Sequence, residues 1–199
     1  MPSPFDFSVK PVLEGETVRL RPFRAADGPS MLKILAEAEL RRLTGSVETA
    51  AEASRPHSPE AAEAILKWYQ SRSQQDDRLD LAIIDKAADA LVGEVVFNEV
   101  DETARTANFR ILIGQAGQNR GIGSAAIALL LRYGFLSLEL SKVTLEVFAF
   151  NPRAISVYQK SGFALEEILP EDFSFDGQLT DTLVLGLTRV EYISHQETD

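Results

Sequence analysis

Apolar and polar residues follow two different periods along this chain, and each period predicts a kind of element. In residues 17–23 apolar positions alternate with arginines, a period of two that is typical of a half-buried strand. After the segment 114–123, apolar side chains recur at i, i+3, i+4 and i+7 as far as about residue 135, which predicts a largely buried helix. The same two periods predict strands and helices along the rest of the chain.

Capping residues indicate where helices begin and end. Asp27 offers a side-chain acceptor to a helix that runs to about residue 43. Residues 58–60 (Ser-Pro-Glu) combine a cap, a proline and an acid at another helix start, and Gly162 is placed to end a helix. The remaining predictions are a loop over 44–57, a helix from 58 that fades at 71–75, strands over 79–85, 91–100, 105–113 and 142–148, a helix over 152–161, and strands over 164–168 and 179–191.

The resulting order is β-α-α-β-β-β-α-β-α-β-β, with an antiparallel meander in the middle and one late β-α-β crossover. It predicts an α/β protein of the α+β kind, whose mixed central sheet is mostly antiparallel. No internal repeat or linker divides the sequence. We therefore expect a single domain over residues 1–199, with its core at about 16–192 and terminal extensions at 1–15 and 193–199.

Composition narrows the classes of function. The formal charge is -10, from 20 Lys and Arg against 30 Asp and Glu, and such a field repels nucleic-acid backbones and anionic membranes. Cysteine is absent and histidine occurs only at positions 57 and 195, which argues against disulfides, a Ser-His-Asp triad and a histidine-rich metal site. We expect no metal, no nucleic acid and no membrane partner. Because no export signal or membrane span is recognisable, we expect a cytoplasmic protein, monomeric or homodimeric.

A glycine-bearing segment between a strand and a helix is the first candidate for chemistry. It reads Gln118-Asn119-Arg120-Gly121-Ile122-Gly123. Its glycines let the backbone approach a ligand closely, and the first amides of a helix bind phosphate or pyrophosphate. A plain helix cap explains the same glycines. A P-loop lysine is absent, and the G-x-G-x-x-A match at 121–126 lacks the acid with which a dinucleotide fold binds ribose.

The second candidate segment covers residues 151–163. Asn151 stands at a strand end, and Tyr158 follows seven residues later, within about 20° of the same helix face. One side of this helix therefore presents an amide and, two turns later, a phenol. A helix cap and a tyrosine with its ring in the core explain these residues without any function.

The two segments in this order resemble the GNAT superfamily of N-acetyltransferases. The resemblance rests on Q-x-x-G-x-G opening a helix and, after the next strand, N-x-x-A-x-x-x-Y-x-K-x-G-F, and it runs from about Glu16 to Tyr192. The stretches TVRLRPFRAAD and DGQLTDTLVLGLTRVEY resemble the branch that acetylates the N-terminal alanine of ribosomal proteins. The resemblance implies a GNAT-like acyl-CoA N-acyltransferase fold with its crossover at the cofactor site. It also implies an enzyme that moves the acetyl group of acetyl-CoA directly to a primary amine, with a protein N-terminal α-amine as the first candidate.

The resemblance further implies roles for individual residues. Tyr158 would lie near the thioester sulfur and protonate the leaving thiolate. Leu112 and Ile113 would pair with the pantetheine arm, Asn151 would bind near it, and Arg153 would reach the phosphate end of the cofactor. The residues implied to hold the pyrophosphate of acetyl-CoA are Gln118, Asn119, Arg120, Gly121, Ile122, Gly123 and Ser124.

Departures from the family pattern leave the general base unassigned. Ala154 stands where this branch often has serine, and Asn108 where relatives often carry glutamate. On the strand over 91–100, Glu94 shares a face with Val96 and Asn98. Glu94 is either a catalytic residue that takes the ammonium proton through water, or a structural acid paired with an arginine such as Arg110.

Three other functions stay open at this point. The chain resembles an enzyme, but a non-catalytic acyl-CoA-binding module would keep the same cofactor segments. A phosphate- or nucleotide-binding regulator would use the same glycine turn. An acetyltransferase for a small-molecule amine, such as a polyamine, an aminoglycoside or an amino acid, would share every motif named above.

Overall fold

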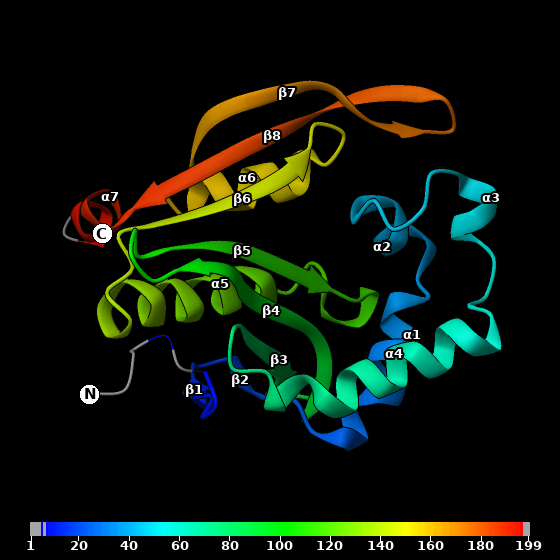
Figure 1. The fold of residues 1–199 in the computed structure, drawn as a ribbon, viewed down its shortest axis with the longest axis horizontal. Helices are drawn as coiled ribbons and strands as arrows, with labels where there is room; N and C mark the ends of the chain where they lie inside the picture. The colour runs from blue at the N-terminus through cyan, green and yellow to red at the C-terminus, as the bar shows by residue number, and fades with distance from the viewer. Residues whose placement is uncertain (1–4, 6, 197–199) are drawn as a thin grey trace.

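The computed structural model describes residue 5 and residues 7–196 of the chain, so residues 1–4, 6 and 197–199 of the expected terminal extensions lie outside it. Within the described part, one eight-stranded sheet has the order β1-β2-β3-β4-β5-β6-β8-β7 (Figure 1). The strands are β1 Leu13–Glu14, β2 Val18–Pro22, β3 Leu79–Asp85, β4 Ala90–Asp101, β5 Thr106–Ile113, β6 Lys142–Phe148, β7 Ala164–Phe175 and β8 Gln178–Thr188. The helices are α1 Gly28–Leu35, α2 Ala38–Leu43, α3 Ala50–Ala53, α4 Pro59–Ser71, α5 Ile122–Arg132, α6 Pro152–Lys160 and α7 Arg189–Gln196.

Strand pairing confirms the predicted sheet. Neighbouring strands are antiparallel except β5 and β6, which are parallel and joined by the crossover through α5. The predicted start of α4 is also confirmed, because Ser58 Oγ accepts a hydrogen bond from the Ala61 amide at 3.2 Å. Gly162 ends α6 with a φ of 96°.

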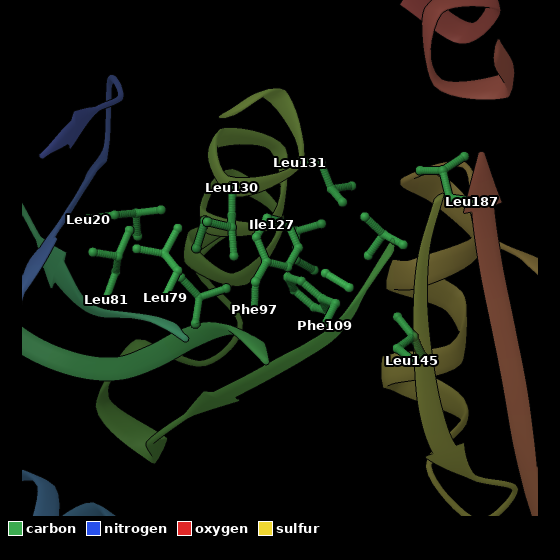
Figure 2. Close-up of a cluster of buried hydrophobic side chains, with 14 of the residues drawn as sticks. Leu20, Leu79, Leu81, Phe97, Phe109, Ile127, Leu130, Leu131, Leu145 and Leu187 are labelled. Carbon is green, nitrogen blue, oxygen red and sulfur yellow. The ribbon is translucent and has the colours of Figure 1, made fainter. Parts of the chain in front are cut away.

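Helices cover both faces of the sheet and bury its centre. The apolar side of α5 packs against β2 to β5, and Figure 2 shows strand side chains directed toward Ile127 and Leu130 of that helix: Leu20, Leu79, Leu81 and Phe97. On the opposite face α1 and α4 form a second cluster that includes Met31 and Tyr69. Because both faces are covered, every residue of β3 is buried. Among the described residues, no helix is both long and apolar enough to cross a membrane.

The single helix predicted over residues 27–43 is wrong, because the chain breaks into α1 and α2. Glu37 adopts an extended conformation (φ -66°, ψ 121°), and its carboxylate accepts a hydrogen bond from the Gln115 amide at 2.8 Å. Asp27 does not cap α1 with its side chain. Its carboxylate instead forms two hydrogen bonds, of 2.7 and 2.8 Å, with the Arg21 guanidinium. The loop predicted over 44–57 contains the short helix α3.

The end of the chain also differs from the prediction. Strand β7 continues to Phe175 rather than ending at 168, β8 ends at Thr188, and residues 189–191, predicted as strand, begin the helix α7. The two long strands are joined by Asp176 and Gly177, with φ angles of 50° and 76°. Asp-Gly is a strong hairpin signal of this kind, and it was visible in the sequence.

Gly93 marks a point where two strands approach too closely for any side chain. The β3–β4 register shifts there, so that Ile83 faces Gly93 and Ile84 faces Leu91. A Cβ atom on Gly93 would overlap the carbonyl oxygen of Leu112 on β5. The absence of a side chain at Gly93 therefore lets the end of β5 lie close to the bulge in β4.

We expect Gly93→Ala to lower the free energy of unfolding by at least about 2 kcal/mol, because overpacking a close backbone contact forces strands apart. Urea denaturation measures this. Gly123→Ala is the matched control, since its Cβ would meet only the Ile113 side chain at 3.8 Å. Equal midpoints for the two variants would contradict the assigned contact.

Candidate active site

Strands β5 and β6 are neighbours over only part of their length. They pair through three residues each, 106–108 with 142–144. Beyond Asn108, β5 stays paired with β4 as far as Ile113, while β6 stays paired with β8 as far as Phe148. The two strands therefore separate toward their C-terminal ends, as Figure 1 shows. The edge of β5 that carries Leu112 and Ile113 faces this gap, where main-chain groups can pair with an extended ligand.

A pocket lies where the chain leaves β5 and enters α5. Asn119 and Gly121 both have left-handed φ angles, 59° and 74°, and α5 begins at Ile122. The first amides of this helix have no partner within the helix and lie at its positive end. The pocket has a volume of about 220 Å³ and is lined by Ile113, Gly117, Gln118, Asn119, Gly121, Gly123, Ser124, Arg153 and Val157.

Most of this lining was proposed from the sequence, although its two segments are far apart in the chain. Arg153 Nη1 donates a hydrogen bond to Gln118 Oε1 at 3.1 Å, which ties the start of α6 to the loop before α5. The sequence reasoning missed Gly117 and Val157. Val157 lies one helical turn after Arg153, so i, i+4 spacing was a signal that could have found it.

Four proposed cofactor residues lie outside the pocket lining. Ile122 is 2% exposed and belongs to the core beneath α5. Leu112 packs against the cluster on the opposite sheet face. Arg120 forms an ion pair of 2.6 Å with Asp85. Asn151 accepts the N-cap hydrogen bond of α6 at 3.1 Å, which is the structural role considered for it.

Tyr158 lies at the point where β5 and β6 begin to separate. Its ring packs edge-on against Phe109, the first β5 residue beyond the last β5–β6 pair, with centroids 6.3 Å apart. A second edge contact joins it to Phe163 at 6.1 Å. Burial raises the pKa of Tyr158 to about 12, so the hydroxyl keeps its proton at neutral pH.

Glu94 lies on the other face of the sheet, within a buried charged cluster. Its Oε2 accepts a hydrogen bond from the Tyr69 hydroxyl at 2.9 Å and lies 3.8 Å from Arg72 Nη2. Arg72 also pairs with Asp80 at 2.9 Å. Burial raises the pKa of Glu94, against the opposing effect of Arg72. The arginine in the ion pair is therefore Arg72, from the turn after α4, and Arg110, the example named from the sequence, also acts through its charge to lower the pKa of Glu94.

Segments from distant parts of the sequence bridge the wide end of the gap. The Glu37 carboxylate binds the amide of Gln115 just beyond β5, and Gly45, after α2, lies against the ring of Phe148 at the end of β6. The turn of the β7–β8 hairpin reaches α3, whose first amide donates to Asp176 Oδ1 at 3.1 Å. Helices α1 to α3 and this hairpin therefore lie together beside the ends of both strands (Figure 1).

The β7–β8 hairpin is acidic. Residues 164–181, which form most of it, contain six Asp or Glu residues and no Lys or Arg. A surplus of acids in one segment attracts cations and repels anions. Within the described residues, no group of three or more His, Asp or Glu side chains is arranged to hold a metal ion.

Comparison with known proteins gives consistent matches. A family model described as the acetyltransferase (GNAT) domain matches residues 17–164. Spermidine N(1)-acetyltransferase of Vibrio cholerae is 30% identical over 115 residues, 58% of this chain and 66% of that protein. The enzyme of the same name from Escherichia coli K12 is 32% identical over 106 residues, 53% of this chain and 57% of that protein. These matches thus span less than two thirds of the length of either relative.

A solved structure extends the similarity to the whole fold. The spermidine N-acetyltransferase of Vibrio cholerae, in complex with CoA and spermine, aligns with a TM-score of 0.76 and 22% identity. The alignment covers 90% of this chain and 99% of that chain. At this level of identity the similarity establishes the fold, and it agrees with the predicted mixed sheet and late crossover.

A side chain at Gly123 would project toward the pocket rather than into the protein, because its Cβ meets only Ile113 at 3.8 Å. We expect Gly123→Val to stay folded and to bind CoA at least tenfold more weakly, about 1.4 kcal/mol. Isothermal titration calorimetry with CoA measures the affinity, and circular dichroism checks the fold. A folded variant with unchanged affinity would remove the loop from the cofactor site.

Proposed function

The chain belongs to the GNAT acetyltransferase family, and from this premise we propose that it is an acetyl-CoA-dependent N-acetyltransferase acting on a small polycation. The acceptor is a primary amine of a polyamine such as spermidine. The observation that carries the cofactor assignment is the pocket at the start of α5, beside the open edge of β5.

Each part of acetyl-CoA has a matching surface in this proposal. The first amides of α5, with the Ser124 hydroxyl and Arg153, bind the pyrophosphate. The pantetheine arm lies in the gap between β5 and β6 and pairs with the main chain of Leu112 and Ile113. The thioester then reaches the point where the strands meet, next to Tyr158.

The acidic β7–β8 hairpin supports a cationic acceptor. The net charge of -10 and the acids of the hairpin favour a ligand with several positive charges. The similar enzymes from Vibrio cholerae and Escherichia coli are named for spermidine, which is such a molecule. These observations favour the small-molecule alternative over a protein N-terminus, which was the first candidate from the sequence.

The reaction needs a neutral amine and a stabilised leaving group. The amine nitrogen attacks the thioester carbonyl carbon, the C–N bond forms as the C–S bond breaks, and sulfur leaves with the electron pair. A phenol with a pKa of about 12 is a weaker acid than a thiol, at about 8.5. Tyr158 therefore acts by donating a hydrogen bond to the developing thiolate, and the phenol keeps its own proton.

An acceptor screen tests the proposal. Release of free thiol from acetyl-CoA is followed with spermidine, spermine, an amino acid, an aminoglycoside and a peptide with a free N-terminus. We expect the polyamines to give the highest kcat/KM, with a value that falls as salt screens the acids of the hairpin. Turnover with the peptide and with none of the small amines would identify a protein N-terminus as the acceptor. CoA binding without any turnover would indicate a non-catalytic module.

Tyr158→Phe removes the hydroxyl and keeps the ring that packs on Phe109. We expect kcat to fall about 100-fold, because the developing thiolate loses a hydrogen-bond donor, while the affinity for acetyl-CoA changes little. Steady-state kinetics at saturating acetyl-CoA measure this. Near-normal turnover with chemistry rate-limiting would show that Tyr158 is only a core residue.

Glu94 is the proposed base, reached through water, and burial raises the pKa of its carboxyl. An acceptor amine with a pKa of about 10.4 is almost fully protonated at pH 7. Glu94→Gln should therefore lower kcat/KM for the amine most at the low-pH end of the assay, with a smaller loss toward pH 10. CoA affinity should not change.

Glu139→Gln serves as the control for this variant, because Glu139 is an exposed acid that pairs with Arg105 at 2.9 Å. We expect its pH–rate profile to match that of the native chain. If Glu94→Gln also gives a profile of unchanged shape, Glu94 belongs to the structural cluster with Tyr69 and Arg72, and the base lies elsewhere.

A further inference from the structure

The arginine inside the proposed pyrophosphate loop points away from the pocket. Arg120 Nη1 lies 2.6 Å from Asp85 Oδ2 and 3.2 Å from the Ala116 carbonyl oxygen. Its neighbours Asn119 and Gly121 line the pocket, whereas Arg120 does not. The guanidinium and the pocket therefore lie on different sides of the same short loop.

Asp85 is a fixed point in the fold. It is the last residue of β3, its side chain is only 3% exposed, and it is paired with Val18 of β2. Its second carboxylate oxygen, Oδ1, accepts a hydrogen bond from the Ala87 amide at 3.0 Å and so holds the turn into β4. The adjacent Lys86 amide donates to Thr17. One carboxylate oxygen is used to build the hairpin, and the other is used to hold Arg120.

The loop needs such an anchor because of its backbone. Residues 119 and 121, on either side of Arg120, both have left-handed φ angles, which an L-residue such as Asn119 adopts at some cost in energy. A conformation of this kind persists when surrounding contacts fix it. The ion pair fixes the residue between the two, and hence the direction of the amides that begin α5.

We propose that Asp85 is a positioning residue for cofactor binding, which holds Arg120 outward so that the main-chain amides of the 119–124 loop face the pyrophosphate of CoA. This inference rests on the proposed function, since it assumes that CoA is the ligand of the pocket. In this arrangement the positive charge of Arg120 shapes the loop. Arg153, which lines the pocket, is the cationic side chain that faces the ligand.

The opposite arrangement makes a different prediction. If Arg120 instead swings onto the pyrophosphate when CoA binds, Asp85 competes with the ligand for the guanidinium. Removing the Asp85 charge would then strengthen CoA binding. The sign of the effect of Asp85→Asn therefore separates the two arrangements.

The experiment measures CoA affinity by isothermal titration calorimetry for the native chain, Asp85→Asn, Arg120→Ala and the double variant. Asparagine keeps an oxygen for the Ala87 amide and removes the charge. We expect Asp85→Asn and Arg120→Ala each to weaken CoA binding about five- to twentyfold, and the double variant to be no weaker than either. Glu139→Gln, which breaks an exposed pair far from the loop, should bind normally.

Two further readouts distinguish positioning from general damage. At saturating acetyl-CoA, kcat of Asp85→Asn should stay within about twofold of native, so that the defect appears in KM for acetyl-CoA. Without any ligand, amide hydrogen exchange over residues 119–124 should be faster in Asp85→Asn and unchanged elsewhere in the sheet. The conservative variant Arg120→Lys should recover part of the affinity lost in Arg120→Ala.

Tighter CoA binding by Asp85→Asn, additive losses in the double variant, or unchanged exchange over 119–124 would each overturn the proposal. Failure of the native chain to bind CoA would overturn the proposed function itself. Failure of this proposal can be told apart from failure of the proposed function, because the exchange measurement reports on the anchored loop without any ligand.

Discussion

Two parallel strands that pair through only three residues create the feature on which the rest of this structure depends. Where β5 and β6 separate, the sheet opens instead of continuing its ladder of hydrogen bonds. An unpaired backbone edge inside a sheet is unfavourable unless something else binds it, because each amide and carbonyl needs a partner. The gap is therefore suited to an extended ligand with amide groups of its own, and the pocket at the start of α5 lies at one end of it.

The loop before α5 is held from three directions, and each contact comes from a different part of the chain. Glu37 binds the Gln115 amide from the α1–α2 break, Asp85 holds Arg120 from the end of β3, and Arg153 binds Gln118 from α6. The first contact joins the loop to the helices α1 and α2, and the second joins it to the end of β3. The third joins it to the half of the sheet beyond the gap. A ligand in the gap would thus contact parts of the protein that are already fixed relative to each other.

Elements that depend on a short stretch of sequence were predictable from that stretch. The periodicity of α5, the Ser58 cap and the two GNAT-like segments are properties of short stretches, and the structure agrees with them. Contacts between distant segments were not predictable. Glu37 breaks a helix because an amide at position 115 needs an acceptor, Arg120 turns away because Asp85 lies behind it, and Glu94 pairs with Arg72 because α4 crosses that face. In each case the partner is more than 20 residues away in the sequence.

A crystal structure of the chain with CoA would locate the cofactor. We expect the pantetheine arm between β5 and β6, paired with the main chain of Leu112 and Ile113, and the pyrophosphate on the amides that begin α5. We also expect Arg120 to remain paired with Asp85 while Arg153 approaches the phosphates. CoA bound elsewhere, or β5 and β6 paired along their full length with the ligand outside the sheet, would contradict this arrangement.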